Sequence, residues 1–234
     1  MKKAFTLIEL VFVIIVIGIL SSIAMSSFNR PTLIEAANQV VSHLRYTQHL
    51  AMMDNKFDPN DPNWFKSRWQ LFFAKTDGSD KQWAYTIFSD HAGSHTGTPD
   101  KIEIAKNILN TKQFMTGGYS AGTVAYKVSG SVNPEVTVSM NLGHKYNIKD
   151  IEFRGGCRSG VVRRIVYDHI GRLLYGNSRY LNTPYNGTSS PAGSHLVANQ
   201  CRIELCSVLD CNIANDDEII TIAIEPETGY THIL

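Results

Sequence analysis

The sequence predicts an α+β protein in which a long amino-terminal helix, whose first half spans a membrane, packs against a head of antiparallel β-sheet. Three observations lead to this fold class. Glu9 is the only ionisable residue in the largely apolar residues 5–25, residues 33–51 repeat apolar side chains at helical spacing, and later residues form short β-type runs separated by turns. Because the chain shows no pattern of parallel strands with crossover helices, we expect helices and strands to be segregated.

The apolar run predicts a membrane span. At 1.5 Å per residue, residues 5–25 extend roughly 31 Å, which matches the thickness of a hydrocarbon core. Lys2 and Lys3 precede the run, so the positive-inside rule places the amino terminus in the cytoplasm and the remaining chain across the membrane. In a bacterium this predicts a single-pass inner-membrane protein with a periplasmic head.

Glu9 is the unusual residue of this run. A carboxylate at that depth costs on the order of a few kcal/mol and needs a partner. The sequence has no basic residue between Lys3 and Arg30, so the partner must come from outside the span. Two plainer interpretations are a secretory signal peptide cut near residues 21–24 and a simple membrane anchor. Both leave Glu9 unexplained.

The helical pattern continues beyond the apolar run. Apolar or small side chains recur at spacings of three and four, the mark of an amphipathic helix. They are Leu33, Ala37, Val40, Leu44, Thr47 and Ala51. Other residues, such as His43 and Gln48, lie off this stripe. We therefore predict one helix over residues 5–53, kinked where Pro31 removes a backbone hydrogen bond.

The head is predicted to be antiparallel sheet. "WQLFFAK" (69–75) and "WAYTIFSD" (83–90) flank a turn sequence and predict a hairpin. Glycine-containing turns in "YDHIGR" (167–172) and "EPETGYTHI" (225–233) predict two more antiparallel pairs. Further strands are predicted at 102–105, 123–128, 136–142, 148–154, 163–168, 172–176, 201–208 and 219–225.

All four cysteines, Cys157, Cys201, Cys206 and Cys211, follow the predicted span. An oxidising compartment favours disulfides, and four cysteines allow three pairings. Because the spacing of the last three is not C-x-x-C, a zinc site is not predicted. We expect Cys206 to pair with Cys211 across a short loop and Cys157 to pair with Cys201.

The start of the chain resembles a known family. "KKAFTLIEL" (2–10) is similar to the prepilin leader of type IV pilins and type II secretion pseudopilins: a short basic leader, a cut before Phe, then Thr-Leu-Ile-Glu-Leu. The resemblance implies that a prepilin peptidase cuts between Ala4 and Phe5 and methylates the amine of Phe5. It also implies that Glu9 meets the amino-terminal ammonium of a neighbouring subunit. Ala4 departs from the glycine usual before the cut.

Later segments resemble one branch of that family. The helix end "LRYTQHLAM" (44–52), "IVYDHIGRLLYG" (165–176) and the terminal "IITIAIEPETGYTHI" (219–233) look like H-type minor pseudopilins and FimT-like minor pilins. The resemblance implies a pilin-like fold divided into a leader (1–4), a transmembrane and assembly segment (5–30) and a periplasmic head (31–234).

The implied function is structural. We expect a minor pilin or pseudopilin in a periplasmic filament of a type II secretion or type IV pilus system. Its partners would be other pilins, the prepilin peptidase and the inner membrane. The rival without a filament role is a simple membrane-anchored periplasmic domain.

A run of arginines suggests a second function. Between residues 154 and 179 the chain has six arginines and one acid, Asp168. They are Arg154, Arg158, Arg163, Arg164, Arg172 and Arg179. A basic face of this kind could bind DNA through its phosphates, as FimT-like pilins in DNA uptake suggest. Strand alternation places Arg163 and Arg164 on opposite sides, so solvated side chains or salt bridges are the plainer interpretation.

Other chemistry is poorly supported. The net charge of +1 in 234 residues, about −1 once Lys2 and Lys3 are removed, does not by itself indicate nucleic acid. "GYSAG" (118–122) fits a hydrolase elbow only if a helix follows, and a strand-like run follows instead. We therefore predict no enzyme.

Calcium could be held by oxygens of "DPNDPN" (58–63) or "NDDE" (215–218), although turn formation explains both.

Overall fold

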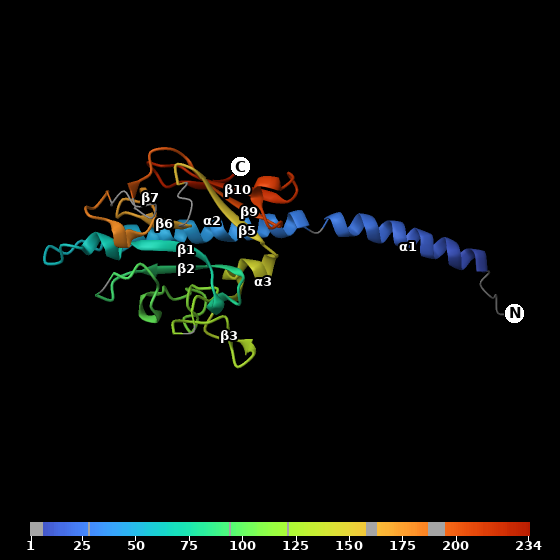
Figure 1. The fold of residues 1–234 in the computed structure, drawn as a ribbon, viewed down its shortest axis with the longest axis horizontal. Helices are drawn as coiled ribbons and strands as arrows, with labels where there is room; N and C mark the ends of the chain where they lie inside the picture. The colour runs from blue at the N-terminus through green and yellow to red at the C-terminus, as the bar shows by residue number, and fades with distance from the viewer. Residues whose placement is uncertain (1–6, 28, 94, 121, 158–162, 187–194) are drawn as a thin grey trace.

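Two long helices form the amino-terminal part of the molecule. The computed structural model describes residues 7–27, 29–93, 95–120, 122–157, 163–186 and 195–234. In these residues α1 (Leu7–Ser27) projects away from the head, whereas α2 (Asn29–Met53) runs through it (Figure 1). A third helix, α3 (Leu142–Tyr146), is a short segment of the head.

The predicted membrane span is wrong. Among the described residues, no helix combines the length and the apolar character that crossing a membrane requires. The predicted single-pass inner-membrane location with a periplasmic head is contradicted by the same finding.

The predicted helix over residues 5–53 is described as two helices, α1 and α2. α1 ends at Ser27 and α2 begins at Asn29. Pro31, where a kink was predicted, lies in the first turn of α2. Residues 5, 6 and 28 lie outside the described part of the chain.

The head contains two main sheets. Its strands are β1 (Trp69–Lys75), β2 (Trp83–Ser89), β3 (Lys127–Val128), β4 (Ser131–Val132), β5 (Asp150–Gly155), β6 (Arg164–Tyr167), β7 (Leu173–Tyr175), β8 (His195–Leu196), β9 (Cys201–Cys206), β10 (Ile219–Ile224) and β11 (Thr231–Ile233). The five-stranded sheet has the order β2-β1-β6-β7-β8, the four-stranded sheet has the order β11-β10-β9-β5, and β3 pairs with β4. All these pairs are antiparallel. The predicted fold class, a long helix with a transmembrane first half packed against an antiparallel β-sheet head, is contradicted because no helix of the described residues could cross a membrane.

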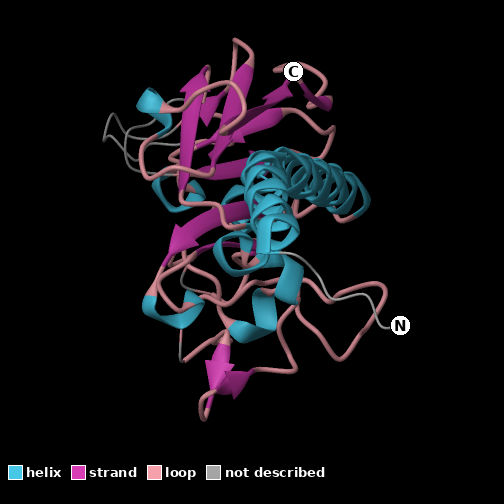
Figure 2. Ribbon diagram, turned by 90° about the vertical axis from the view of Figure 1, so that its right-hand side faces the viewer, coloured by secondary structure: helices cyan, strands magenta, loops and turns pink. Residues whose placement is uncertain are grey.

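Helix α2 packs against both sheets. Its apolar stripe is fully buried at Ala36, Ala37, Val40 and Leu44, each with 0% of its surface exposed. The helix contacts β1 of one sheet and β10 and β11 of the other. Figure 2, which faces the end from which α1 projects, shows α2 between the two halves of the head. Burying this stripe removes most of the apolar surface that α2 would otherwise expose, and so it favours the folded state.

Gln48 attaches two glycine turns to α2. Its Nε2 atom donates hydrogen bonds to the carbonyl oxygens of Gly171 (2.9 Å) and Thr228 (2.7 Å). Gly171 and Gly229 have positive φ angles of 87° and 63°, and a Cβ atom at either residue would meet the Gln48 amide. Glycine is therefore required at both turns by backbone conformation and by the close approach of α2.

Three predicted antiparallel pairs are confirmed. Strands β1 and β2 pair from Trp69 with Ser89 to Lys75 with Trp83. Strands β6 and β7 flank the turn at 168–172, and β10 and β11 flank the terminal turn. In each case the hydrophobic runs and the turn between them were visible in the sequence.

Three other predicted strands are largely wrong. Residues 102–105 form a short 3-10 turn and an isolated bridge, only Lys127–Val128 of 123–128 is strand, and 136–142 leads into α3. Asn141 explains the last case. Its side chain caps α3 at the backbone N–H of His144 and donates to the carbonyls of Ser79 and Gly117. Such side-chain bonds compete with sheet pairing.

Both expected disulfides are present. Cys157 pairs with Cys201 across a sequence separation of 44, and Cys206 pairs with Cys211 across a separation of 5. The long link joins the end of β5 to the start of β9, and the short link joins the end of β9 to the loop after it. The cysteines therefore stabilise both ends of β9, an inner strand of the four-stranded sheet.

Removal of the two disulfides should have unequal effects. Replacing Cys157 and Cys201 together by alanine should lower the free energy of unfolding by about 4 kcal/mol, against about 2 kcal/mol for Cys206 and Cys211, because a longer loop restricts the unfolded chain more. Urea denaturation of the two double variants and the unaltered chain measures both losses. Equal losses, or the reverse order, would contradict the loop-length explanation.

Candidate functional site

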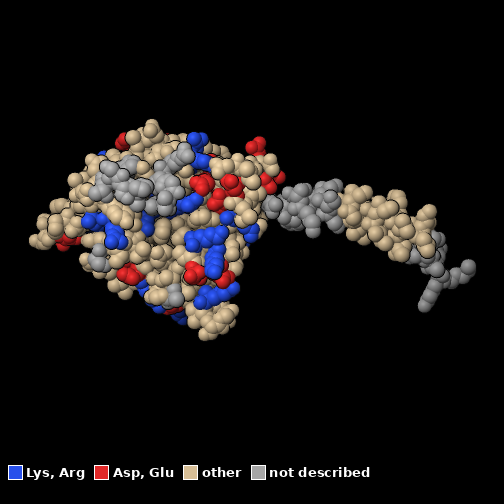
Figure 3. All heavy atoms as spheres, viewed as in Figure 1, with Lys and Arg blue, Asp and Glu red and all other residues tan. Residues whose placement is uncertain are grey.

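The exposed surface of α1 is the most unusual feature of the molecule. The large aliphatic and aromatic side chains of residues 7–20 are exposed, from 40% at Val16 to 81% at Leu7. In Figure 3 the part of α1 drawn in tan carries no visible lysine or arginine. A contiguous apolar surface of this kind is rare on a soluble monomer and marks a surface for contact with another molecule.

Glu9 lies in the first turn of α1 and its side chain is exposed. It is the single acidic or basic residue in the sequence of α1. A negative charge there interacts favourably with the helix dipole, typically by about 0.3–1 kcal/mol. The interaction of Glu9 with the helix dipole would be favourable in any helix, whether or not its other side chains are apolar. Ala4 and Phe5, the expected cleavage and methylation residues, lie outside the described residues.

Three of the predicted DNA-binding arginines are paired with carboxylates. Arg154 donates to Glu204 (3.0 Å), Arg163 to Glu152 (2.6 Å) and Arg172 to Asp168 (2.8 Å). Arg154 also donates to the side-chain oxygen of Asn212. These charges are therefore largely neutralised within the head.

Arg164 is buried on the opposite side of its strand from Arg163. It is 1% exposed, and its guanidinium carbon lies 4.1 Å from the centre of the Phe72 ring. It donates to Gln70 Oε1 (2.8 Å) and to the carbonyl oxygen of Gly97 (2.6 Å). The backbone N–H of Gly97 donates to Asp90 (2.7 Å), so this residue links the two buried charges. Burial lowers the pKa of Arg164 to about 10.

The six arginines therefore do not form one free basic face. Arg179 is exposed and makes a long hydrogen bond to the carbonyl of Thr96 (3.4 Å), while Arg158 lies outside the described residues. The predicted alternation of Arg163 and Arg164 is confirmed, because they contact β5 and β1 respectively. For four of the described arginines, the salt-bridge and buried-contact interpretation agrees best with these contacts.

Arg164 should act as a structural residue. Replacing Arg164 with methionine should lower the free energy of unfolding by about 2–5 kcal/mol, because two buried acceptors lose their donor. Arg179→Met, at an exposed position, should change it by less than about 0.5 kcal/mol. Urea denaturation compares the two variants. Unchanged stability of Arg164→Met, together with loss of salt-sensitive DNA binding, would instead support a nucleic-acid interface.

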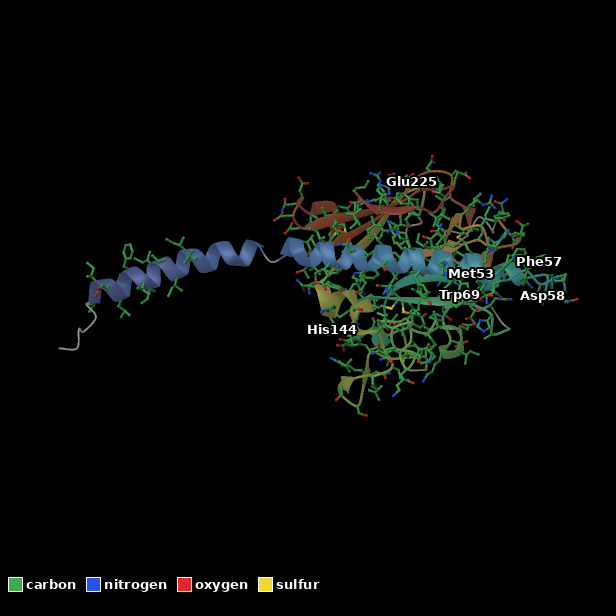
Figure 4. The ribbon with its side chains drawn as sticks, turned by 180° about the vertical axis from the view of Figure 1, so that it is seen from behind. Met53, Phe57, Asp58, Trp69, His144 and Glu225 are labelled. Atoms are coloured by element: carbon green, nitrogen blue, oxygen red, sulfur yellow. A yellow bond between two sulfur atoms is a disulfide. The ribbon has the colours of Figure 1, made fainter. Side chains whose placement is uncertain are left out.

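In the two loops considered for calcium, acidic side chains accept hydrogen bonds from nearby backbone N–H groups and so stabilise turns. Asp58 accepts a hydrogen bond from the backbone N–H of Asn60, and Asp61 accepts one from Asn63, both at 2.8 Å. Glu218 accepts from the backbone N–H of Asn215. Figure 4 places Asp58 with Met53 and Phe57 at the end of the head opposite α1. No group of three or more possible His, Cys, Asp or Glu ligands occurs within the described part of the chain.

The sequence analysis missed a buried polar network beside α2. Tyr85 Oη accepts from Gln39 Nε2 (3.0 Å) and lies 2.6 Å from His43 Nδ1. Gln39 also donates to the carbonyl of Ser139 and accepts from Tyr146 Oη. Burial lowers the pKa of His43 to about 4, so its imidazole is neutral at pH 7. Its Nδ1 can therefore accept a hydrogen bond from the hydroxyl group of Tyr85. The spacing of Gln39 and His43, which places them on one helix face, was the available signal.

The stability of the head should depend on His43 at acidic pH. The folded state holds His43 neutral down to about pH 4, whereas an unfolded histidine takes up a proton near pH 6.5. The unfolded state therefore binds more protons in this window, and stability falls as pH falls through it. Between pH 7 and 4.5 we expect a loss of about 2–3 kcal/mol from this residue.

Urea denaturation at several pH values measures this loss. His43→Gln should reduce the dependence by that amount, and His49→Gln, at an exposed position of α2, should retain it. An identical pH dependence in the unaltered chain and in His43→Gln would show that His43 does not titrate as the structure predicts.

A groove opens where α2 begins. Its volume is about 470 Å³, and we call it the base groove. Its apolar lining residues are Leu33, Ile34, Ile219, Ile220, Ile233 and Leu234. Thr221, Arg202 and Asp216 complete the lining. The groove thus has a mainly aliphatic surface that also contains one basic residue, Arg202, and one acidic residue, Asp216.

Comparison with known proteins does not assign the chain to a class. No protein-family model, curated protein or solved structure matches it significantly. The case for a function therefore depends on the residues and their arrangement.

Proposed function

We propose that this chain is a filament subunit, a minor pilin or pseudopilin of a type II secretion or type IV pilus system. The observation that supports this function is helix α1. It is apolar, its side chains over residues 7–20 are exposed, and it extends away from a head that is already packed around α2. A helix with this surface is suited to packing against the same helix of neighbouring subunits.

The leader sequence supplies the chemistry of assembly. In this proposal a prepilin peptidase cuts between Ala4 and Phe5, removes Lys2 and Lys3, and methylates the new amine of Phe5. Glu9 of one subunit then neutralises the ammonium group of Phe5 on another. Among packed apolar helices an unpaired charge is costly, so the pair favours the register in which the two groups meet.

The head is consistent with this role. Its two disulfides suit an oxidising compartment. Helix α2 packs against both sheets, so the segment that follows α1 is part of the folded core. The alternative of DNA binding requires several free guanidinium groups on one face, and the carboxylate pairs of Arg154, Arg163 and Arg172 reduce their number.

The charge of Glu9 should be required for assembly. Glu9→Gln preserves the size of the side chain but cannot neutralise an ammonium group. We expect the variant to be cleaved and folded normally, and its amount in purified filaments to fall at least about tenfold, since a mispaired charge costs more than the 1.4 kcal/mol of a tenfold change. Immunoblotting of sheared filaments against total cell protein measures incorporation.

Glu35→Gln is the matched control. Glu35 is an exposed acid on α2, so its removal should leave incorporation unchanged. Normal incorporation of Glu9→Gln would contradict the proposed role of Glu9, and equal losses in both variants would indicate a general effect of charge.

A further inference from the structure

We propose that the base groove binds helix α1 of a second copy of this chain. This inference rests on the proposed filament function and adds to it a specific docking surface on the head. It follows from the chemistry of the groove, its position and the surface of α1.

The groove presents aliphatic side chains that the head does not cover completely. Ile34 is 43% exposed and Leu234 is 63% exposed, and Ile219, Ile220 and Ile233 are half-buried. They come from α2, β10 and the end of the chain, so the surface is built by three segments. Arg202 and Asp216 also line the groove. An apolar surface accompanied by polar residues is the usual composition of a protein interface.

The position of the groove favours a helix from another subunit. Leu33 and Ile34 lie near the start of α2, on the side of the head from which α1 leaves. Because α1 of the same chain extends away from the head (Figure 1), it does not lie along β10 and β11. A neighbouring subunit displaced in the opposite direction to that in which α1 projects would bring its own α1 past this end of the head.

Helix α1 offers a matching surface. Ile8, Phe12, Ile15 and Ile19 recur at spacings of four, three and four, so they share one helix face. Each is at least 55% exposed, and together they span roughly 17 Å at 1.5 Å per residue. The sequence of α1 contains no basic residue, so Arg202 meets no like charge from it. Burial of this face against the groove would remove apolar surface from water on both partners.

Cysteine cross-linking in assembled filaments tests the contact. All four native cysteines are in disulfides, so an added cysteine has no free thiol of its own chain as a partner. Two differently tagged chains are co-expressed with the assembly system, one carrying Ile15→Cys in α1 and the other Ile219→Cys in β10. A dimer bearing both tags on a non-reducing gel can form only between subunits.

The matched control replaces Ile219→Cys by Val128→Cys. Val128 lies on β3, away from the base groove, and is 54% exposed. We expect at least tenfold more mixed dimer with Ile219→Cys than with Val128→Cys. Equal yields, or dimers formed only between two Ile15→Cys chains, would overturn the inference.

Incorporation separates this inference from the proposed function. If both cysteine chains enter filaments without the expected cross-link, the filament function stands and the base groove binds something else. If the unaltered chain enters no filaments, the proposed function fails and the inference fails with it. As an independent measurement, Ile219→Glu should reduce incorporation at least tenfold with an unchanged urea midpoint, whereas Val128→Glu should not.

Discussion

Burial of the apolar face of α2 is the constraint on which the rest of the head depends. The two sheets are separate in their strand pairing, and both pack against the side chains of α2. Ala36 and Ala37 have no exposed surface, and their small size allows close approach of neighbouring elements. Leu44 fills the same core further along. The side chain of Gln48 then donates hydrogen bonds to two turns, one from each sheet, and so holds both turns to α2.

The two long helices therefore have opposite requirements. Helix α2 satisfies its apolar face within its own chain, whereas the described side chains of α1 are exposed. Exposure of the apolar side chains of α1 to water costs free energy, and association with another molecule removes that cost. This difference connects the fold to the proposed function, in which the projecting helix supplies the surface for assembly and the head packs around α2.

The sequence predicted the hairpins well because each had a local signal. The β1–β2, β6–β7 and β10–β11 pairs combine apolar runs with turn residues, and α2 follows from its 3–4 spacing. The membrane span predicted from the apolar run is not borne out, because no helix of the described residues could cross a membrane. The strand predicted at 136–142 failed because Asn141 bonds to distant carbonyls, which no local pattern reveals. Neighbouring arginines suggested one patch, yet their partners on β1, β5 and β9 are set by tertiary structure.

The central claim is that α1 is an assembly helix whose working amino terminus is created before Phe5. The most direct test is the mass of the amino-terminal peptide of the chain isolated from cells with and without the prepilin peptidase. The account predicts a methylated peptide that begins at Phe5 when the peptidase is present and an unprocessed peptide when it is absent. A peptide that begins at Met1 in both cells would contradict the claim.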